Sequence, residues 1–220
     1  MTRRSHFQRL LLLAASTTVI AGGAVLPSSA MAATAAPHTA AVTTVASDHD
    51  GHRQHGSPTS AKQWVETTDT ASGITFRLPE KPKVEHYTKA KGRASGRFYT
   101  VENDHGIVGF LVIDASGAQL NLNDCLLSFV DGYNAESHSS SEVLTSTGVH
   151  KTTVNGRPAL DARLSAPDGT VGSARFIHDG DHYVVALSLG PKEKEKPMSE
   201  SYQQLLASIH MPDAGATRAG

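Results

Sequence analysis

The chain has 220 residues, of which 39% are hydrophobic and 19% are charged, as is usual for a soluble globular protein. Its formal net charge of −1 provides no overall basic field, which excludes a protein drawn by charge to nucleic acid or to anionic membranes. Cys125 is the only cysteine, which excludes an internal disulfide, so the fold must depend on its own hydrophobic core.

The first 32 residues have the three parts of a secretory signal peptide. Arg3 and Arg4 precede an apolar run over 10–26, and Ala30-Met31-Ala32 supplies the small residues of a cleavage site. Serine, threonine and glycine interrupt the run, which disfavours a transmembrane helix of about 20 apolar residues. The arginine pair fits the twin-arginine route less well, because Phe7 stands one place late, so the general secretory route is favoured.

This signal predicts a secreted or extracellular protein with no transmembrane segment after cleavage. Cleavage after Ala32 removes three arginines and no acid, which takes the net charge from −1 to −4. No cysteine lies near the cleavage site, so nothing supports a lipid anchor. We therefore expect neither nucleic acid nor a charged membrane surface as a partner.

Residues 33–61 predict a disordered tether, because they are rich in small and polar residues and lack large apolar ones. His49, His52 and His55 recur at every third position beside two aspartates, so an extended polyproline-like chain would place the three imidazoles on one side. Such a run could bind Zn(II), Cu(II) or Ni(II), either as a function or adventitiously. The alternative is a solvated linker that needs no cofactor.

The folded domain is expected over 62–212, followed by a disordered tail over 213–220. Alternating apolar residues between prolines and glycine-containing turns predict strands in its first half. The last of them, 107–113, is apolar on both faces, which predicts a central strand covered on both sides. The expected strands are 64–68, 74–78, 84–88, 97–102 and 107–113.

The hydrophobic period then changes from two residues to that of a helix. The apolar stripe predicts an amphipathic helix that Asn121 or Asn123 caps at its start. Its members are Leu122, Leu126, Phe129, Val130 and Tyr133.

Strand character resumes at 143–154 and continues as a four-strand antiparallel meander to Leu189. Three turn signals divide it: Asn155-Gly156, Pro167-Asp168-Gly169 and Asp179-Gly180. Both the Asn-Gly and the Asp-Gly pair are expected to take positive φ at their two residues, as a type I′ hairpin turn requires.

A loop over 191–198 leads to a last helix, which Ser199 is expected to cap and in which Tyr202, Leu205 and Ile209 share a face. Strands and helices are therefore segregated along the chain. This predicts an α+β fold, with an antiparallel sheet of about six to eight strands flanked by two helices.

Three segments resemble the PsbP-like secreted domains that are common in actinobacteria. The segment Gly73-Ile74-Thr75-Phe76-Arg77-Leu78-Pro79 with Pro82 resembles the opening strand of that family. Val154-Asn155-Gly156-Arg157-Pro158-Ala159 resembles its hairpin, and Arg175-Phe176-Ile177 with His182-Tyr183-Val184-Val185 resembles a strand pair. The family is related in fold to photosystem II PsbP and to mycobacterial LpqN-type proteins. The resemblance implies an antiparallel sheet flanked by helices, and it carries over no catalytic residue, because the matching positions are turns and core.

A basic stretch around one expected hairpin is the candidate ligand-binding surface. Lys89, Lys91, Arg93 and Arg97 could bind an acidic polymer or a protein of the cell envelope. The alternative is a solvated edge that its charges protect from pairing with other strands.

Two further groups of residues offer chemistry. His178 and His182 flank an Asp-Gly-Asp turn and could ligate a metal, although turn chemistry alone explains the aspartates and the glycine. Cys125 lies at the edge of the helical stripe, where packing is the simpler explanation than a reactive thiol. The sequence contains no recognised catalytic motif, but distant residues could still assemble a triad.

These observations favour an exported, non-catalytic binding domain of the cell envelope or the extracellular space, expected as a monomer. Its partner would be an envelope protein or polymer. Two alternatives stay open: a metal-binding protein that uses the histidines of the tether, and a hydrolase with an unrecognised site.

Overall fold

The computed structural model describes residues 64–88, 95–115, 121–135, 137 and 139–212. The expected signal peptide, the tether with His49, His52 and His55, and the C-terminal tail lie outside the described residues. The following paragraphs concern the described part of the chain alone.

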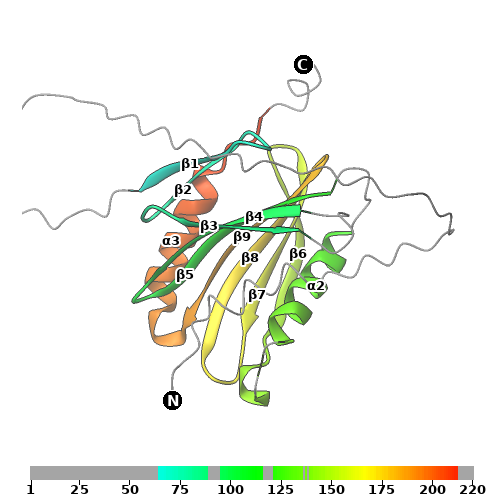
Figure 1. Ribbon diagram of the computed structural model, residues 1–220. Coiled ribbons are helices and arrows are strands. Elements are labelled where there is room, and N and C mark those ends of the chain that lie inside the picture. The colour runs from blue at the N-terminus through cyan, green and yellow to red at the C-terminus, as the bar shows by residue number, and fades with distance from the viewer. Residues whose placement is uncertain (1–63, 89–94, 116–120, 136, 138, 213–220) are drawn as a thin grey trace, which may run out of the picture. The chain divides into compact units, whose positions relative to one another are not determined.

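Seven strands form one antiparallel sheet in the order β3-β4-β5-β9-β8-β7-β6 (Figure 1). The four strands from β6 to β9 are consecutive neighbours, so the predicted C-terminal meander and the α+β class are confirmed. The strands are β3 (Lys83–Thr88), β4 (Ser95–Asn103), β5 (Gly106–Asp114), β6 (Thr145–Val154), β7 (Arg157–Ser165), β8 (Thr170–Asp179) and β9 (His182–Pro191).

The first two predicted strands do not join this sheet. β1 (Val65–Asp69) and β2 (Ile74–Leu78) form a separate antiparallel pair. Residue Thr75 of this pair makes a β-bridge with His210, near the end of the described chain. The two-stranded sheet is therefore tied to the C-terminal segment through backbone hydrogen bonds.

The meander turns show why one turn prediction was right and another was wrong. Asn155 and Gly156 both have positive φ, 50° and 78°, as predicted for a type I′ turn. At the hairpin between β8 and β9 the central pair is Gly180-Asp181, and only Gly180 has positive φ, at 59°. This is the pattern of a type II′ turn, in which glycine takes the first central position and Asp179 still belongs to the strand.

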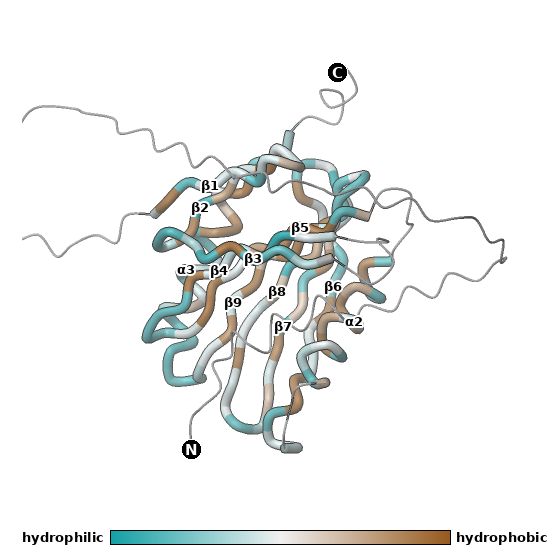
Figure 2. Tube along the Cα trace, viewed as in Figure 1, coloured by the Kyte–Doolittle hydropathy of each residue, from teal (hydrophilic) through white to brown (hydrophobic). Residues whose placement is uncertain are grey.

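Each face of the sheet has its own hydrophobic core. Helix α2 (Leu122–Asn134) covers one face, where its Phe129 ring meets Phe176 of β8 edge to face, with ring centroids 5.8 Å apart. Helix α3 (Glu195–Ser208) covers the other face together with β1 and β2. Strand β5 contributes to both cores, so the prediction that it is central and covered on both sides is confirmed. In Figure 2, hydrophobic stretches lie within the strands and α2, while many connecting turns are hydrophilic.

Helix α2 begins as predicted, because the side chain of Asn121 accepts a hydrogen bond from the backbone N–H of Asn123. Helix α3 begins at Glu195, five residues earlier than predicted, so Ser199 lies inside the helix and does not cap it. A short 3-10 turn, η2 (Lys192–Lys194), leads directly into Glu195, and Pro197 stands inside the first helical turn. Proline is tolerated there because the first backbone N–H groups of a helix need no helical acceptor. A second 3-10 turn, η1 (Ser140–Glu142), precedes β6.

None of the helices in the described ranges has both the length and the apolar character needed to cross a lipid bilayer.

Candidate functional site

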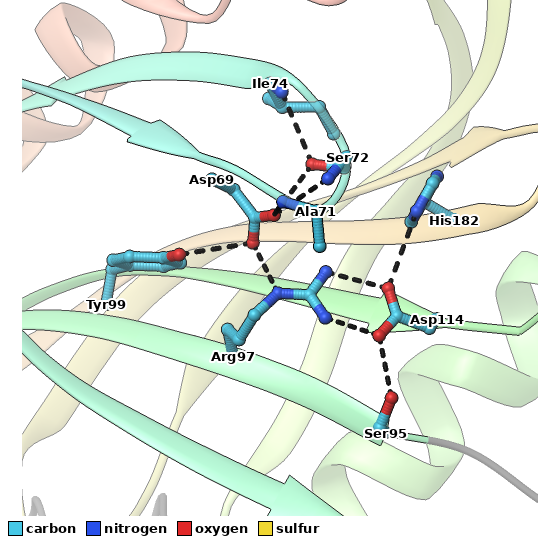
Figure 3. A network of polar contacts seen from close by, with 9 residues as sticks. All are labelled: Asp69, Ala71, Ser72, Ile74, Ser95, Arg97, Tyr99, Asp114 and His182. Atoms are coloured by element: carbon cyan, nitrogen blue, oxygen red, sulfur yellow. Dashed lines mark hydrogen bonds and ion pairs between the residues drawn. The ribbon is translucent and has the colours of Figure 1, made fainter. Parts of the chain in front are cut away.

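A polar row crosses one end of the sheet on the α3 face. Register places Ser95 opposite Asp114, Asp114 opposite His182, and His182 opposite Asp179, on strands β4, β5, β9 and β8. Arg97 follows two residues after Ser95 and therefore points to the same face. Figure 3 shows Ser95, Arg97, Asp114 and His182 converging beneath the β1–β2 turn.

Asp69, at the end of β1, is the most buried member of the cluster, with no exposed surface. One carboxylate oxygen accepts hydrogen bonds from the backbone N–H groups of Ala71 and Ser72 and from the Ser72 hydroxyl, at 3.0–3.1 Å (Figure 3). The other accepts from Arg97 Nε at 2.6 Å and from the Tyr99 hydroxyl at 3.2 Å. A buried carboxylate is tolerated because its lone pairs are satisfied in this way.

Arg97 lies between two carboxylates. Its Nε donates to Asp69, and its two terminal nitrogens donate to the two oxygens of Asp114. Burial alone would lower the pKa of Arg97, but the hydrogen bonds to Asp114 and Asp69 raise it. Its positive charge is therefore fixed, and it ties the β1–β2 turn to the start of β4.

Asp114 is the half-buried end of the cluster. It also accepts a hydrogen bond from the Ser95 hydroxyl at 2.7 Å, and His182 Nε2 lies 3.5 Å from its other oxygen. Burial acts to raise the pKa of the Asp114 carboxyl, but hydrogen bonds from Arg97 and Ser95 and the attraction of Arg97 and His182 lower it on balance. The carboxylate form is thus the one that the fold favours.

We expect the stability of the protein to fall on acidification through this carboxylate. A lowered pKa in the folded state gives a stabilisation that is full above the unfolded-state pKa of about 4 and is lost as pH falls through the folded-state value. The variant Asp114→Asn should be less stable at pH 7 and should lose less stability between pH 5 and pH 3. Urea midpoints at several pH values measure this, and parallel pH profiles for the two proteins would contradict it.

The structure places the predicted ligand-binding residues in two different settings. Arg97 is only 12% exposed at its side chain and is paired within the fold. Lys89, Lys91 and Arg93 lie outside the described residues. They belong to segment 89–94, which joins Thr88 to Ser95, and these two strand ends are register partners. Arg97 therefore fixes the start of β4, the strand that the basic segment enters.

The turn residues that were considered as metal ligands are engaged separately. The His178 ring stacks on Tyr183, with centroids 4.6 Å apart, whereas Asp179 pairs with Arg157, and His182 faces Asp114. No cluster of three or more metal-ligating side chains occurs among the residues that the structure describes.

Cys125 is partly buried on α2, where it packs against the hydrophobic core of that face. Burial, followed by the nearby charge of Asp124, raises the pKa of the Cys125 thiol to about 11. The thiol is therefore protonated at neutral pH, which suits packing and not nucleophilic attack.

A second set of ion pairs lies further along the same face of the sheet. Arg175 donates two hydrogen bonds to Asp161, at 2.5 and 2.6 Å, and His150 Nε2 lies 3.4 Å from the same carboxylate. The hydrogen bonds to Asp161 raise the pKa of Arg175. These three residues are register partners across β6, β7 and β8, so the pairing follows directly from the strand alignment.

Comparison with known proteins identifies the fold. No protein-family model and no curated protein matches the sequence. The structure is similar to the solution structure of cyanobacterial PsbP (CyanoP) from Synechocystis sp. PCC 6803, with a TM-score of 0.50 and 12% identity over 72% of this chain and 98% of that chain. It also matches the crystal structure of LpqN, involved in cell envelope biogenesis of Mycobacterium tuberculosis, with a TM-score of 0.37 and 11% identity over 68% of this chain and 91% of that chain. The similarity to CyanoP shows that the chain has a PsbP-like fold, which confirms the resemblance at the level of the fold.

Proposed function

We propose that this protein is an exported domain of the cell envelope or extracellular space that acts by binding and not by catalysis. Its contact surface is the basic segment 89–94, which carries Lys89, Lys91 and Arg93 and no acid. Its partner is an acidic polymer or an acidic protein surface.

The observation that carries this proposal is the set of hydrogen bonds that fixes the start of β4, directly after the segment. Ser95 and Arg97, which follow the segment on the α3 face of β4, are fixed by Asp114 and Asp69. The neighbouring positive charge of Arg97 is already neutralised by these two carboxylates. We therefore assign Arg97 the role of a positioning residue and assign the partner contact to Lys89, Lys91 and Arg93.

The test is a triple charge reversal, Lys89→Glu, Lys91→Glu and Arg93→Glu. The immobilised protein is incubated with cell-envelope extract of the source organism, and the bound polymer and protein are measured at 50 and 300 mM salt. We expect the reversal to reduce the bound material at least about fivefold at low salt, because like charges across a contact are strongly unfavourable.

The chain offers a matched control in Lys192→Glu, Lys194→Glu and Lys196→Glu. These lysines lie in η2 and at the start of α3, and the control changes the net charge equally. Equal losses in both triple variants would mean a general charge effect and would overturn the proposal. An unchanged yield with the first variant would overturn it as well.

A further inference from the structure

We propose that the α3 face of strands β6, β7 and β8 carries a second binding site, specific for an anionic group on a hydroxyl-rich chain such as an acidic glycan. We call this surface the β6–β8 shelf. Its residues are Thr147, His150, Asp161, Arg163, Ser173 and Arg175. It is a different surface from the basic segment 89–94, so the two proposals can fail separately.

The first argument is the charge pairing on these strands. The three strands contain only two acids, Asp161 and Asp179, and each already pairs with an arginine: Asp161 with Arg175 and Asp179 with Arg157. Arg163 is the remaining arginine. It is exposed, and within the described part of the chain no ion pair or side-chain hydrogen bond engages its guanidinium.

The second argument is what surrounds Arg163. Its register partners are Thr147 on β6 and Ser173 on β8, which both carry hydroxyls. In the neighbouring row, by contrast, the register partner of Arg175 is Asp161, which supplies a carboxylate. An external carboxylate or phosphate can therefore bind Arg163 much as Asp161 binds Arg175, with hydroxyl groups on both sides. Bidentate charge-assisted hydrogen bonds make arginine well suited to such anions.

A β-bulge completes the shelf. The register of β6 slips by one residue between Thr147 and His150, at Gly148, whose φ is +58°. Without the extra residue, Val149 would stand opposite Asp161. With it, Thr147 and His150 lie on the same face, and the His150 side chain is 65% exposed beside Asp161. The bulge thus replaces an apolar residue by an imidazole, whose Nδ1 lies 3.1 Å from the Gly148 carbonyl oxygen and whose Nε2 faces Asp161.

Arg163 and Thr147 of the shelf are exposed because α3 covers the other part of this face. Helix α3 packs mainly against β9, β2 and β8, and Tyr202, which lies near Asp161 and Arg175, marks the helix side of the shelf. The Arg163 guanidinium can bind the anionic group of a sugar chain while the hydroxyls of Thr147 and Ser173 bond to the sugar hydroxyls, which an acidic peptide such as poly-L-glutamate lacks.

The test measures binding of two anionic glycans, polygalacturonate and a poly(glycerol phosphate) teichoic acid, to the purified protein at 50 mM salt. These probes separate carboxylate from phosphate as the preferred anion, and poly-L-glutamate represents an acidic peptide. We expect Arg163→Gln to weaken binding of at least one glycan about tenfold, as expected for a lost charge-assisted hydrogen bond. Arg163→Lys should restore binding only in part.

The matched control is Lys151→Gln, which removes the same charge from β6 on the opposite face, where Lys151 is opposite Leu160. Lys151→Gln should leave the affinity for the glycans within about twofold of the native value, since the effect of an exposed charge on the opposite face of the sheet is screened by solvent and salt. Amide NMR shifts should move at Thr147, Arg163 and Ser173. Equal losses in both variants, no binding of either glycan, or tighter binding of poly-L-glutamate would overturn the proposal.

Discussion

Replacing Asp69 by alanine should reduce the free energy of unfolding by about 3–5 kcal/mol, the range seen when one partner of a buried ion pair is removed. Asp69 is fully buried and accepts hydrogen bonds from two backbone N–H groups, a serine, a tyrosine and Arg97. The substitution leaves these donors without an acceptor in a water-poor environment, although Arg97 keeps its contact with Asp114. Urea denaturation followed by circular dichroism measures the loss.

The control for this experiment is an exposed ion pair on the same two-stranded sheet. Glu66 of β1 pairs with Arg77 of β2 at 3.0 Å, with side chains 60% and 57% exposed. Glu66→Ala should therefore cost at most about 1 kcal/mol. If Asp69→Ala cost no more than Glu66→Ala, the network around Arg97 would not be what holds β1 and β2 to the main sheet.

The second large effect is expected at Phe76 in β2. Its ring is completely buried, stacks on Phe110 of β5 with centroids 3.9 Å apart, and meets Tyr99 of β4 edge to face at 5.1 Å. Phe76→Ala should cost about 3–5 kcal/mol, through lost burial and the cavity that remains. The urea midpoint should fall with little change in slope, because the same surface is exposed on unfolding.

A matched apolar truncation is Leu127→Ala, since Leu127 is 57% exposed on α2. It should change the free energy of unfolding by less than about 0.5 kcal/mol. A loss below about 1 kcal/mol for Phe76→Ala would show that the two-stranded sheet is not an integral part of the core under α3.

Local sequence was sufficient for much of the fold, because strand alternation and glycine turns are short-range signals. Asn155-Gly156 has one favoured hairpin geometry, so its turn type could be predicted. Asp179-Gly180-Asp181 offers two choices for the central pair, and the strand register decides between them. The start of α3 was missed because Pro197 is an ambiguous signal, compatible with a loop as well as with a first helical turn.

The polar cluster was beyond such reasoning because its members meet through tertiary structure. Arg97 pairs with an aspartate 28 residues before it and another 17 residues after it. The Asp-x-x-Ser-Gly sequence at Asp69 does signal a turn, and Asp114 does follow an apolar strand. Neither signal identifies Arg97 as the common partner, so Arg97 was assigned to the basic surface on composition alone. Likewise, the sequence alone does not show that Arg163 lacks an acidic partner on these strands. This follows only from the structure, in which Arg157 pairs with Asp179 and Arg175 pairs with Asp161.

The position of β9 in the middle of the sheet determines when the sheet can be completed during folding. Strands β3, β4 and β5 form one half of the sheet, β6, β7 and β8 form the other, and β9 joins them although it comes last in sequence. The complete sheet cannot assemble until residues 182–191 are available, and its central pairing with β5 spans a long stretch of sequence. A polypeptide that emerges N-terminus first therefore cannot complete its sheet until β9, the last strand, has been made, when synthesis is nearly finished.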